Sequence, residues 1–521
     1  MEPTSLPPDS ASATRTVAAI DIGSNSIRLS VAQVLPEGRI EIIERLQRAV
    51  RLGQDTFRRG RLGGQSMRAA VDVLRDFKQV LELYKVERVR AVTTSAVREA
   101  ANADNFLDRV FMATGLTVEV IATSEESRLT VSAVRQAVGH ALGVDEGQSL
   151  IADVGGGSTL LTLLENGEID NWMSLRLGSI RLQEMLFTSQ EPPERSAELL
   201  RHHIAGVVSS AERSLNLTQV KSFIAAGGDV RFAAREAGKP TTSTDLYTVA
   251  RVDLDRLVRR CARKTAEELA KLHGLPFAEA ETLTPALLVY QALLHRTAVD
   301  QMIISRVSMR DGLVLELARH ATGEEDAAMV EGIIHSAIAL GEKYRADLGH
   351  AQQVAEIALL LFDELQADHG LRPRHRLLLQ VAALLHELGG YISPQAHHKH
   401  SFYLIRNSEI FGLTRQEVEI VAHIARYHRR SGPKLSHVEF MSLMRESRVV
   451  ISKLAAILRV ADALSRSRIK PIKAVRLERQ DDDLTIYLPS QRSLILEERA
   501  LDIKKDMFED IYGLRIRLEE A

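Results

Sequence analysis

Two short apolar runs of the chain share one pattern, in which an aspartate near the end is followed by glycine and hydroxyl residues. The first run is Val17-Ala-Ala-Ile-Asp-Ile-Gly-Ser-Asn-Ser26, and the second is Leu150-Ile-Ala-Asp-Val-Gly-Gly-Gly-Ser-Thr159. Their aspartates, Asp21 and Asp153, lie 132 positions apart (153 − 21 = 132). An apolar run that stops at glycine is typical of a buried strand that enters a tight turn. Because the pattern recurs, the sequence predicts a duplicated fold.

The hydrophobic pattern after the first run predicts strands, then a helix, then strands again. The expected strands are 27–34, 40–46, 88–92 and 116–121. One helical face is formed by Ala70, Leu74, Phe77, Leu81 and Tyr84. Helix N-termini are expected at the hydroxyl residues 93–95, and at Thr123 or Ser124 as a cap. By itself, Glu126 would then only complement the dipole of the second of these helices.

The pattern after the second run repeats this order. Strands are expected at 160–164, 168–175 and 222–226, and Asn166-Gly167 is typical of a hairpin turn between the first two. A helix is expected from about 179, residues 253–300 are helical in pattern, and a last helix starts within 307–313. From about residue 325 the pattern is almost wholly helical. The end of the chain predicts strands at 474–478, 484–488, 493–497 and 514–518 and a helix from about 500, which is a small α/β unit.

Composition narrows the class of protein. A chain of 521 residues is expected to form several domains. A net charge of −2 and the lack of an apolar run near 18 residues argue against nucleic acid and membrane as partners. The single cysteine, Cys261, fits a reducing compartment, so the cytoplasm is expected. Residues 1–16 are rich in Pro, Ser and Thr and are predicted to be a disordered tail.

The two glycine-containing stretches carry the candidate chemistry. Glycine and serine let backbone N–H groups approach an anion closely, and an aspartate at a strand end can reach a cation. Each stretch alone could be an ordinary tight turn. Two in register favour a phosphate held between the halves. The candidate phosphate-binding residues are Gly23, Ser24, Asn25, Ser26, Gly155, Gly156, Gly157, Ser158 and Thr159.

The helical region is rich in histidine. Histidines and carboxylates on neighbouring helices can form a metal site. They can equally be surface histidines beside Arg426, Arg429, Arg430 and Lys434, which together would attract a polyanion. The residues in question are His350, His386, Glu387, His397, His398, His400, His423, His428 and Asp462.

With these residues in view, the chain resembles the exopolyphosphatase / guanosine pentaphosphate phosphohydrolase family (Ppx/GppA) over nearly its whole length after the tail. Each matching motif is weak alone, but their order and spacing are specific. The motifs are Asp21-Ile-Gly-Ser-Asn-Ser26, Val50-Arg-Leu-Gly53, Thr94-Ser-Ala-Val-Arg-Glu99, Glu125-Glu-Ser-Arg128, Asp153-Val-Gly-Gly-Gly-Ser-Thr159, Ala226-Gly-Gly228 and Arg310-Asp-Gly312.

The resemblance implies an architecture of four domains. Two actin-like α/β domains of the sugar-kinase/actin superfamily are expected at 17–135 and 136–322. An all-helical HD-like domain would follow at 323–470 and a small α/β domain at 471–521. The family also implies a homodimer.

The resemblance implies roles for individual residues as well. Glu126 matches the family's catalytic glutamate, which orients or deprotonates the attacking water, and Arg98 matches an arginine that contacts phosphate. Asp153 matches a carboxylate assigned to Mg²⁺. A carboxylate base beside such an ion should have a lowered pKa.

The chain departs from the family pattern at two places. Leu160 stands where the family has a glutamate that helps to hold the metal, so Asp21 or Glu126 is a candidate for the missing ligand. In the helical domain, His350, His386 and Asp462 lie where HD phosphohydrolases have metal ligands, but Glu387 replaces an aspartate. His400 and His428 resemble the further histidines of two-metal sites. The alternative is a helical scaffold whose basic face, including Lys399, Arg406, Arg429 and Arg430, guides a polyphosphate tail.

The sequence therefore predicts an exopolyphosphatase that needs Mg²⁺ and removes terminal orthophosphate processively from inorganic polyphosphate. The alternative within the family is hydrolysis of the 5′-terminal phosphate of guanosine pentaphosphate (pppGpp). Two alternatives come from other classes: an ATP-dependent transferase of the sugar-kinase type, and a catalytically impaired regulator that binds polyphosphate or nucleotide. Glu126 argues against the regulator, and Leu160 argues for it.

Overall fold

The computed structural model describes residues 14–36, 38–138, 147–212, 214–241, 246–322, 327–466, 475–488 and 494–520. It divides into two compact units, residues 1–327 and 328–521. The predicted tail lies outside the described residues up to position 13, and its last two residues, Arg15 and Thr16, already belong to the first strand. The finer domain boundaries given above stay predictions.

The first sheet of the first unit has the strand order β3-β2-β1-β4-β5. β1 pairs with β2 antiparallel and with β4 parallel, β2 pairs with β3 antiparallel, and β4 pairs with β5 parallel. Its strands are β1 (Arg15–Ile22), β2 (Ser26–Val34), β3 (Ile40–Ala49), β4 (Arg88–Thr93) and β5 (Val118–Val120).

The second sheet repeats this topology. Its order is β10-β11-β12-β9-β6-β7-β8, and the five strands β8-β7-β6-β9-β12 show the same sequence of antiparallel and parallel pairs as the first sheet. The predicted duplication is therefore confirmed. The strands are β6 (Gln148–Val154), β7 (Thr159–Glu165), β8 (Glu168–Leu175), β9 (Ser222–Ala226), β10 (Lys239–Pro240), β11 (Leu246–Ala250) and β12 (Gln301–Ser305).

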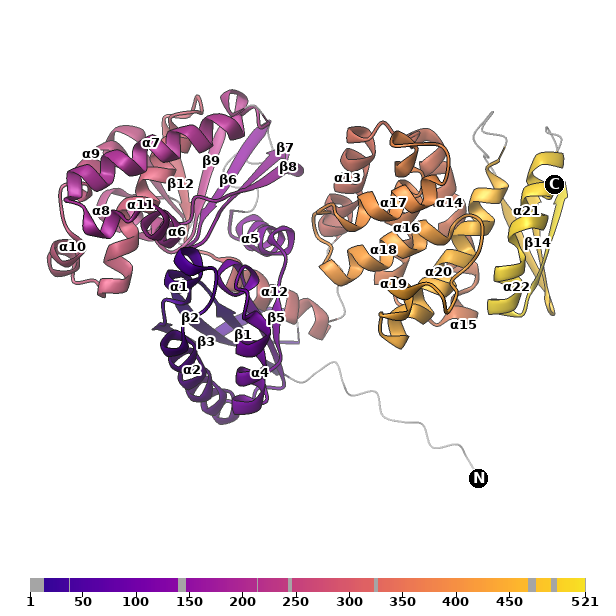
Figure 1. Cartoon of the computed structure of the whole chain (residues 1–521), viewed down its shortest axis with the longest axis horizontal. Coiled ribbons are helices and arrows are strands. Elements are labelled where there is room, and N and C mark those ends of the chain that lie inside the picture. Colours follow the sequence, from indigo (N-terminus) through magenta and orange to yellow (C-terminus); the bar gives the residue numbers. More distant parts are fainter. Residues whose placement is uncertain are drawn as a thin grey trace. The chain divides into compact units, whose positions relative to one another are not determined.

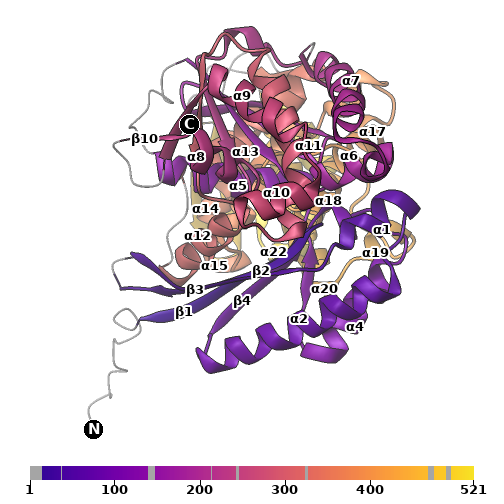
Figure 2. The same cartoon turned by 90° about the vertical axis from the view of Figure 1, so that its left-hand side faces the viewer.

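Helices pack on both sheets, and Figure 2 shows α2 and α4 along one face of the first sheet. The predicted helical face is buried in α2, with Ala70, Leu74, Phe77 and Leu81 at most 4% exposed. The helices are α1 (Leu52–Arg59), α2 (Gly64–Leu83), α3 (Ser95–Arg98), α4 (Ala103–Thr114), α5 (Thr123–Val138), α6 (Ser179–Leu186), η1 (Thr188–Gln190), α7 (Pro193–Glu212), η2 (Leu217–Gln219), α8 (Val230–Ala237), α9 (Arg251–Cys261), α10 (Ala266–His273), α11 (Phe277–Leu294) and α12 (Met309–Thr322).

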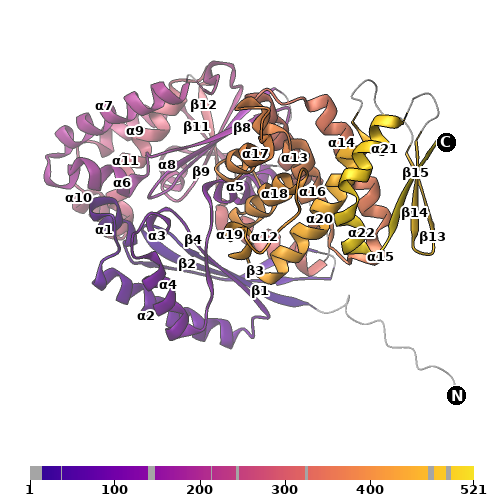
Figure 3. The same cartoon turned by 45° about the vertical axis from the view of Figure 1, so that its right-hand side comes forward.

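The second unit is helical at its core and ends in a three-stranded sheet of order β13-β14-β15 (Figures 1 and 3). Leu484 and Phe508 from this end belong to the same hydrophobic core as α14, α16, α18 and α20. The elements are α13 (Ala327–Lys343), α14 (Leu348–Glu364), α15 (Gln366–His369), α16 (Pro373–Leu385), η3 (Leu388–Tyr391), α17 (His397–Arg406), α18 (Arg415–Tyr427), α19 (Val438–Met441), α20 (Arg445–Leu464), β13 (Arg476–Gln480), β14 (Asp483–Leu488), α21 (Ile495–Lys504), α22 (Asp506–Tyr512) and β15 (Arg515–Glu520). Among the described residues, no helix combines the length and apolar character needed to cross a membrane.

Three local predictions were wrong or incomplete. The strand expected at 493–497 is instead the start of α21, whose first turn contains Glu497 and Glu498, as suits a helix N-terminus. Neither Thr123 nor Ser124 is a cap, because α5 already includes both. The strands β10, β11 and β12 were not predicted.

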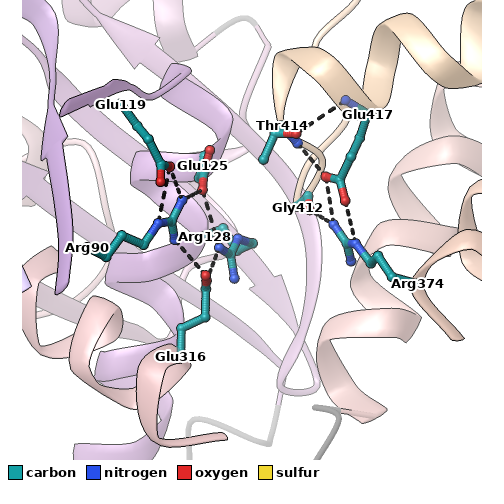
Figure 4. Close-up of polar contacts among 9 residues, drawn as sticks. All are labelled: Arg90, Glu119, Glu125, Arg128, Glu316, Arg374, Gly412, Thr414 and Glu417. Carbon is teal, nitrogen blue, oxygen red and sulfur yellow. Dashed lines mark hydrogen bonds and ion pairs between the residues drawn. The ribbon is translucent and has the colours of Figure 1, made fainter. Parts of the chain in front are cut away.

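A charged network ties the last helix of the first unit to its first sheet (Figure 4). Arg90 on β4 bonds Glu316 on α12 through Nη1 at 2.6 Å and Glu119 through Nη2 at 3.0 Å. Its Nη2 also bonds Glu125 on α5, which is 4% exposed. Arg128 contacts both Glu316 and Glu125, so two guanidinium groups neutralise the buried carboxylate of Glu125 and the partly exposed one of Glu316. In the second unit, Figure 4 shows the ion pair between Arg374 and Glu417.

Replacing Arg90 with methionine should destabilise the first unit by about 3 kcal/mol, because the carboxylates of Glu125 and Glu316 are then left to share the single guanidinium of Arg128. The measurement is guanidinium-induced unfolding followed by the fluorescence of Trp172, the only tryptophan of the chain, on β8 of the same unit. As a control, Arg75→Met removes an exposed ion pair with Asp72 and should change stability by no more than about 0.5 kcal/mol. Equal effects of the two substitutions would contradict the structural importance of the network.

Candidate active site

The two glycine-containing loops meet in the first unit around one small polar cavity. The loop after β1 and the loop after β6 contact each other, since a Cβ on Gly156 would lie 3.0 Å from Ser24 Cβ and 3.8 Å from the backbone N of Asn25. A cavity of about 100 Å³ opens between them. Its lining includes eight of the nine predicted phosphate-binding residues, namely Gly23, Ser24, Asn25, Ser26, Gly155, Gly156, Gly157 and Ser158.

Thr159 is the ninth predicted phosphate-binding residue, and its side chain makes a structural contact instead of lining the cavity. It is fully buried, and its Oγ1 donates a hydrogen bond of 2.9 Å to the carbonyl of Leu177. The hydroxyl therefore joins β7 to the segment before α6 and does not line the cavity among the residues that the structure describes.

The hydroxyl residues at 93–95 also serve contacts other than a helix cap. Thr93 Oγ1 donates to the carbonyl of Ile22 at 3.0 Å, and Ser95 Oγ lies 3.2 Å from Ser24 Oγ. Thr94, the residue before α3, makes no side-chain cap. These contacts fix the first loop against the end of β4, next to the cavity.

A buried arginine holds the second loop. Arg181 on α6 is 2% exposed, its Nε donates to the carbonyl of Gly157, and its guanidinium lies over the ring of Phe57 at 4.1 Å. Its Nη1 bonds Glu99 at 3.0 Å. Because Glu99 follows α3 in the first half, this arginine joins the two halves beside the cavity.

Glu126 lies at the cavity from the first turn of α5. Arg98, the last residue of α3, is its partner, with 3.4 Å between Nη1 and Oε2, and Nη1 also donates to the carbonyl of Ile121 at 2.8 Å. Burial, together with the carboxylates of Asp153 and Asp21, raises the pKa of Glu126 to about 7, against the opposing effect of Arg98. The sequence-based expectation of a lowered pKa assumed a bound cation; the protein groups by themselves act in the opposite direction.

Further carboxylates crowd the same cavity. Asp21, Asp153 and Asp229 line it together with Glu126. Burial raises the pKa of Asp153, and burial raises the pKa of Asp229 to about 6. Thr130 Oγ1 donates to Asp153 at 3.1 Å, and Thr282 Oγ1 donates to Asp229 at 2.7 Å. Four carboxylate groups at one cavity fit a hard cation such as Mg²⁺, which prefers oxygen ligands.

Leu160 lies directly beside Asp153. The two residues are paired in the antiparallel ladder of β6 and β7, so their side chains are on the same face of the sheet. The equivalent pair of the first half is Asp21 and Arg28, whose Nη1 lies 3.4 Å from Asp21 Oδ2. A guanidinium thus accompanies one aspartate, whereas an apolar side chain that is 4% exposed accompanies the other.

The sequence analysis missed several residues at the cavity, above all Asp229 and Arg28. Asp229 follows Gly227-Gly228 at the end of β9, which repeats the pattern of strand, glycine and acid seen at the other loops. Arg28 could be found only by pairing β2 with β1. Thr94, Ser95, Gly227 and Gly228 belong to motifs named in the sequence, but these residues were not assigned to the cavity. The further lining residues that were not predicted are Val154, Ser179, Thr282, Ser308 and Met309.

In the second unit, most of the candidate histidines are buried, so the prediction of surface histidines was wrong for them. His350, His386 and His428 are at most 5% exposed. The donor atoms of His350, His386 and Glu387 lie within 4.8 Å of one another, and so do those of His386, His428 and Asp462. Among the described residues, His400 belongs to neither group, whereas His397 lies beside His428, with 3.2 Å between the two Nε2 atoms.

A duplicated α/β fold with two glycine loops and four carboxylates around one cavity defines a protein that acts on phosphate groups. The chain belongs to the Ppx/GppA phosphatase family. The model of that family matches residues 30–321, and a second model, Ppx/GppA phosphatase domain III, matches residues 334–507. The family resemblance is confirmed, whereas the HD-like character of the helical unit stays a prediction.

Among similar proteins of known name are two bacterial enzymes called guanosine-5′-triphosphate,3′-diphosphate pyrophosphatase. The one from Vibrio vulnificus is 28% identical over 483 residues, covering 91% of this chain and 92% of the relative. The one from Photobacterium profundum is 25% identical over 453 residues, covering 85% of this chain and 86% of the relative.

Solved structures share the fold of about three fifths of the chain. An exopolyphosphatase from Cytophaga hutchinsonii has a TM-score of 0.53 and 22% identity, covering 60% of this chain and 99% of that one. An exopolyphosphatase-like protein has a TM-score of 0.52 and 24% identity, covering 59% and 98%. These likenesses show that the matched part of the chain shares its fold with these proteins.

The raised pKa of Glu126 predicts a pH effect on stability when divalent ions are chelated. The folded state binds this proton more tightly than the unfolded state, so the stabilisation is present below about pH 4.5 and is lost as the pH rises to about 7. Glu126→Gln removes the effect, and its melting temperature should exceed that of the native chain by a few degrees above pH 7 but not at pH 5.

The measurement is thermal unfolding in EDTA at pH 5, 6, 7 and 8, followed by Trp172 fluorescence. Glu165→Gln at the exposed end of β7 is the matched control and should parallel the native chain at every pH. A constant difference between Glu126→Gln and the native chain over this range would contradict the assignment.

Proposed function

We propose that the chain hydrolyses the terminal phosphoanhydride bond of a polyphosphorylated substrate and releases orthophosphate. The observation that carries the proposal is the position of Glu126 at the cavity between the two glycine loops. Phosphoryl transfer to water needs a positioned nucleophile and groups that neutralise the negative charge of the transition state. The cavity combines candidates for both needs.

In this proposal the two loops hold the terminal phosphate through backbone N–H groups, as such loops do in other phosphate sites. Glu126 orients the attacking water and accepts its proton, a role that its carboxylate can take because it lines the cavity between the two loops. Arg98 keeps Glu126 in position, and Arg28 provides positive charge at the cavity.

Mg²⁺ is the proposed cofactor. Asp153 would hold it, with Asp21 or Asp229 as a further ligand, and the ion would neutralise charge on the phosphate oxygens. Asp229 is the better second candidate, because Asp21 already has Arg28 as a partner. Mg²⁺ commonly keeps several waters and needs only one or two protein carboxylates, so the presence of Leu160 is compatible with activity.

Two substrates fit this chemistry. Guanosine pentaphosphate is favoured by the names of relatives that align with most of the chain. Inorganic polyphosphate, the first choice from sequence, is supported by a basic pocket of about 480 Å³ in the second unit. Cationic and aromatic side chains line that pocket, namely Lys399, Arg406, Arg415, Arg426, Phe402 and Tyr403. Such a surface suits a polyanion or a nucleotide.

Phosphate release from the two substrates, measured side by side, tests the proposal. The native chain with Mg²⁺ should release phosphate from at least one of them, and the higher kcat/KM identifies the preferred substrate. Glu126→Gln should lower kcat by about 10²–10⁴-fold while substrate binding is kept, because the variant loses the base but not the loops. Glu165→Gln should keep native activity. If neither substrate is cleaved, or Glu126→Gln is fully active, the proposed function is wrong.

A second test concerns Leu160. Since this position lies beside Asp153, Leu160→Glu should add a carboxylate to the metal site and lower the Mg²⁺ concentration for half-maximal activity by roughly an order of magnitude. Leu160→Gln has the same size without the charge and should leave the Mg²⁺ requirement unchanged or higher. The measurement is activity against Mg²⁺ concentration. The same requirement in both variants would show that position 160 does not reach the ion.

A further inference from the structure

A second cluster of metal-ligating side chains lies inside the helical unit, away from any residue used in the proposed function. His350 on α14, His386 directly after α16 and Asp462 on α20 converge there, each at most 5% exposed. His350 Nε2 and His386 Nε2 both lie 3.7 Å from Asp462 Oδ1. Within the described part of the chain, neither Nε2 atom has a hydrogen-bond partner.

The hydrogen bonds on the other side of each ring fix how the imidazoles are presented. His386 Nδ1 donates to the carbonyl of Ala383 at 2.6 Å, so the Nε2 of the neutral ring carries the lone pair. His350 Nδ1 lies 3.2 Å from Ser465 Oγ. Metal-ligating histidines commonly have their second ring nitrogen held in this way.

This arrangement brings electron-rich atoms together. When the rings of His350 and His386 are neutral and protonated at Nδ1, each Nε2 has a lone pair. These two lone pairs and the Oδ1 atom of Asp462 then lie close together. Such a group is repulsive unless a cation lies between its members.

We propose that His350 Nε2, His386 Nε2 and Asp462 Oδ1 bind one divalent transition-metal ion. Donors at about 2.1 Å from such an ion are about 3.0–3.5 Å from one another, so the observed 3.7 Å needs only a small contraction. Two imidazoles with one carboxylate favour Zn²⁺, Mn²⁺ or Fe²⁺ over Mg²⁺. Glu387 lies close enough to provide a further oxygen.

The surroundings limit the site to one ion. Lys504 on α21 forms an ion pair with Asp462 through Oδ2, so this carboxylate offers only Oδ1 to a metal. His428 Nδ1 donates to the carbonyl of Ala425 at 2.5 Å, and its Nε2 therefore accepts from His397 Nε2 at 3.2 Å. The lone pair of His428 is used by that contact, so His428 is not among the three ligands.

The alternative is that no metal binds and that a proton on His386, together with Lys504, neutralises Asp462. Metal analysis of the full-length chain, without a histidine tag, distinguishes the two. After growth in medium with added Zn²⁺, Mn²⁺ and Fe²⁺, elemental analysis should find one equivalent of metal in the native chain. The metal content of His386→Ala and of Asp462→Asn should be at least tenfold lower. Ions bound at the candidate active site do not affect this comparison, because the native chain and both variants have the same residues there.

The matched control is His423→Ala. His423 is a fully buried histidine of the same unit whose ring nitrogens make no hydrogen bond with other described residues, and it lies outside the two donor groups. This variant should keep the metal. Titration of the stripped chain with Co²⁺ should give a visible absorption band that His386→Ala lacks, with circular dichroism as the check that each variant folds. If His386→Ala does not fold, His350→Gln takes its place.

The variant Lys504→Met distinguishes the effect of the Lys504 ammonium group on Asp462 from that of a bound metal ion. The metal proposal expects this variant to hold at least as much metal as the native chain. The proposal is overturned if the native chain and His386→Ala have equal metal content and equal Co²⁺ spectra. It is also overturned if Lys504→Met binds a metal and the native chain does not, because Lys504 would then take the place of the metal in the native chain. Phosphatase activity is not part of the readout, so this result is independent of the proposed function.

Discussion

The close contact between two glycine loops is the constraint on which the candidate active site depends. A Cβ on Gly156 would lie 3.0 Å from Ser24 Cβ of the first loop, and one on Gly157 would lie 2.0 Å from Ser95 Oγ of the first half. Only backbone fits at these points, so the two halves can approach closely enough to form one small cavity from both loops. Arg181 stabilises this contact between the halves, because its guanidinium forms hydrogen bonds with both the second loop and Glu99 of the first half.

The sequence predicted the elements whose signal is local. Apolar runs that end in glycine predicted β1, β6 and β9, and Asn166-Gly167 predicted its hairpin, since both residues have the positive φ that this turn requires. The sequence did not predict what depends on pairing between segments. Arg28 became informative only when the ladder of β1 and β2 placed it beside Asp21, and the position of Leu160 beside Asp153 likewise came only from the ladder of β6 and β7. Likewise, Thr159 belongs to a loop motif, but the fold turns its hydroxyl toward Leu177. For the histidines, one-dimensional spacing could not distinguish a buried cluster from a surface one, because the deciding contacts come from α14, α16 and α20.

The pairing of Arg28 and Leu160 makes the cavity electrically asymmetric. The duplication puts these two residues at equivalent positions, yet one is a cation and the other is apolar. Asp21 has its charge balanced by a guanidinium, whereas Asp153 has only the hydroxyl of Thr130 as a described partner within hydrogen-bond distance. On the side of Asp153, Arg28 and Arg231 act only from beyond ion-pair distance, while Glu126 and Asp229 line the same cavity. A mobile cation has most to neutralise on that side, which agrees with the proposed position of Mg²⁺.

The two clusters of buried donors differ in the chemistry that they offer. The cavity of the first unit presents carboxylate and hydroxyl oxygens, which suit a hard cation that keeps part of its water. The cluster of the second unit presents two imidazole nitrogens and one carboxylate oxygen in a space without an exposed side chain, which suits a softer ion that gives up its water. Because the ligand types differ, the two sites can bind different ions from the same solution. Neither site needs to discriminate between ions by their radius. On this argument a Mg²⁺-dependent phosphatase and a transition-metal site can exist in one chain, and replacing an imidazole in the second cluster need not change the ion requirement of the first.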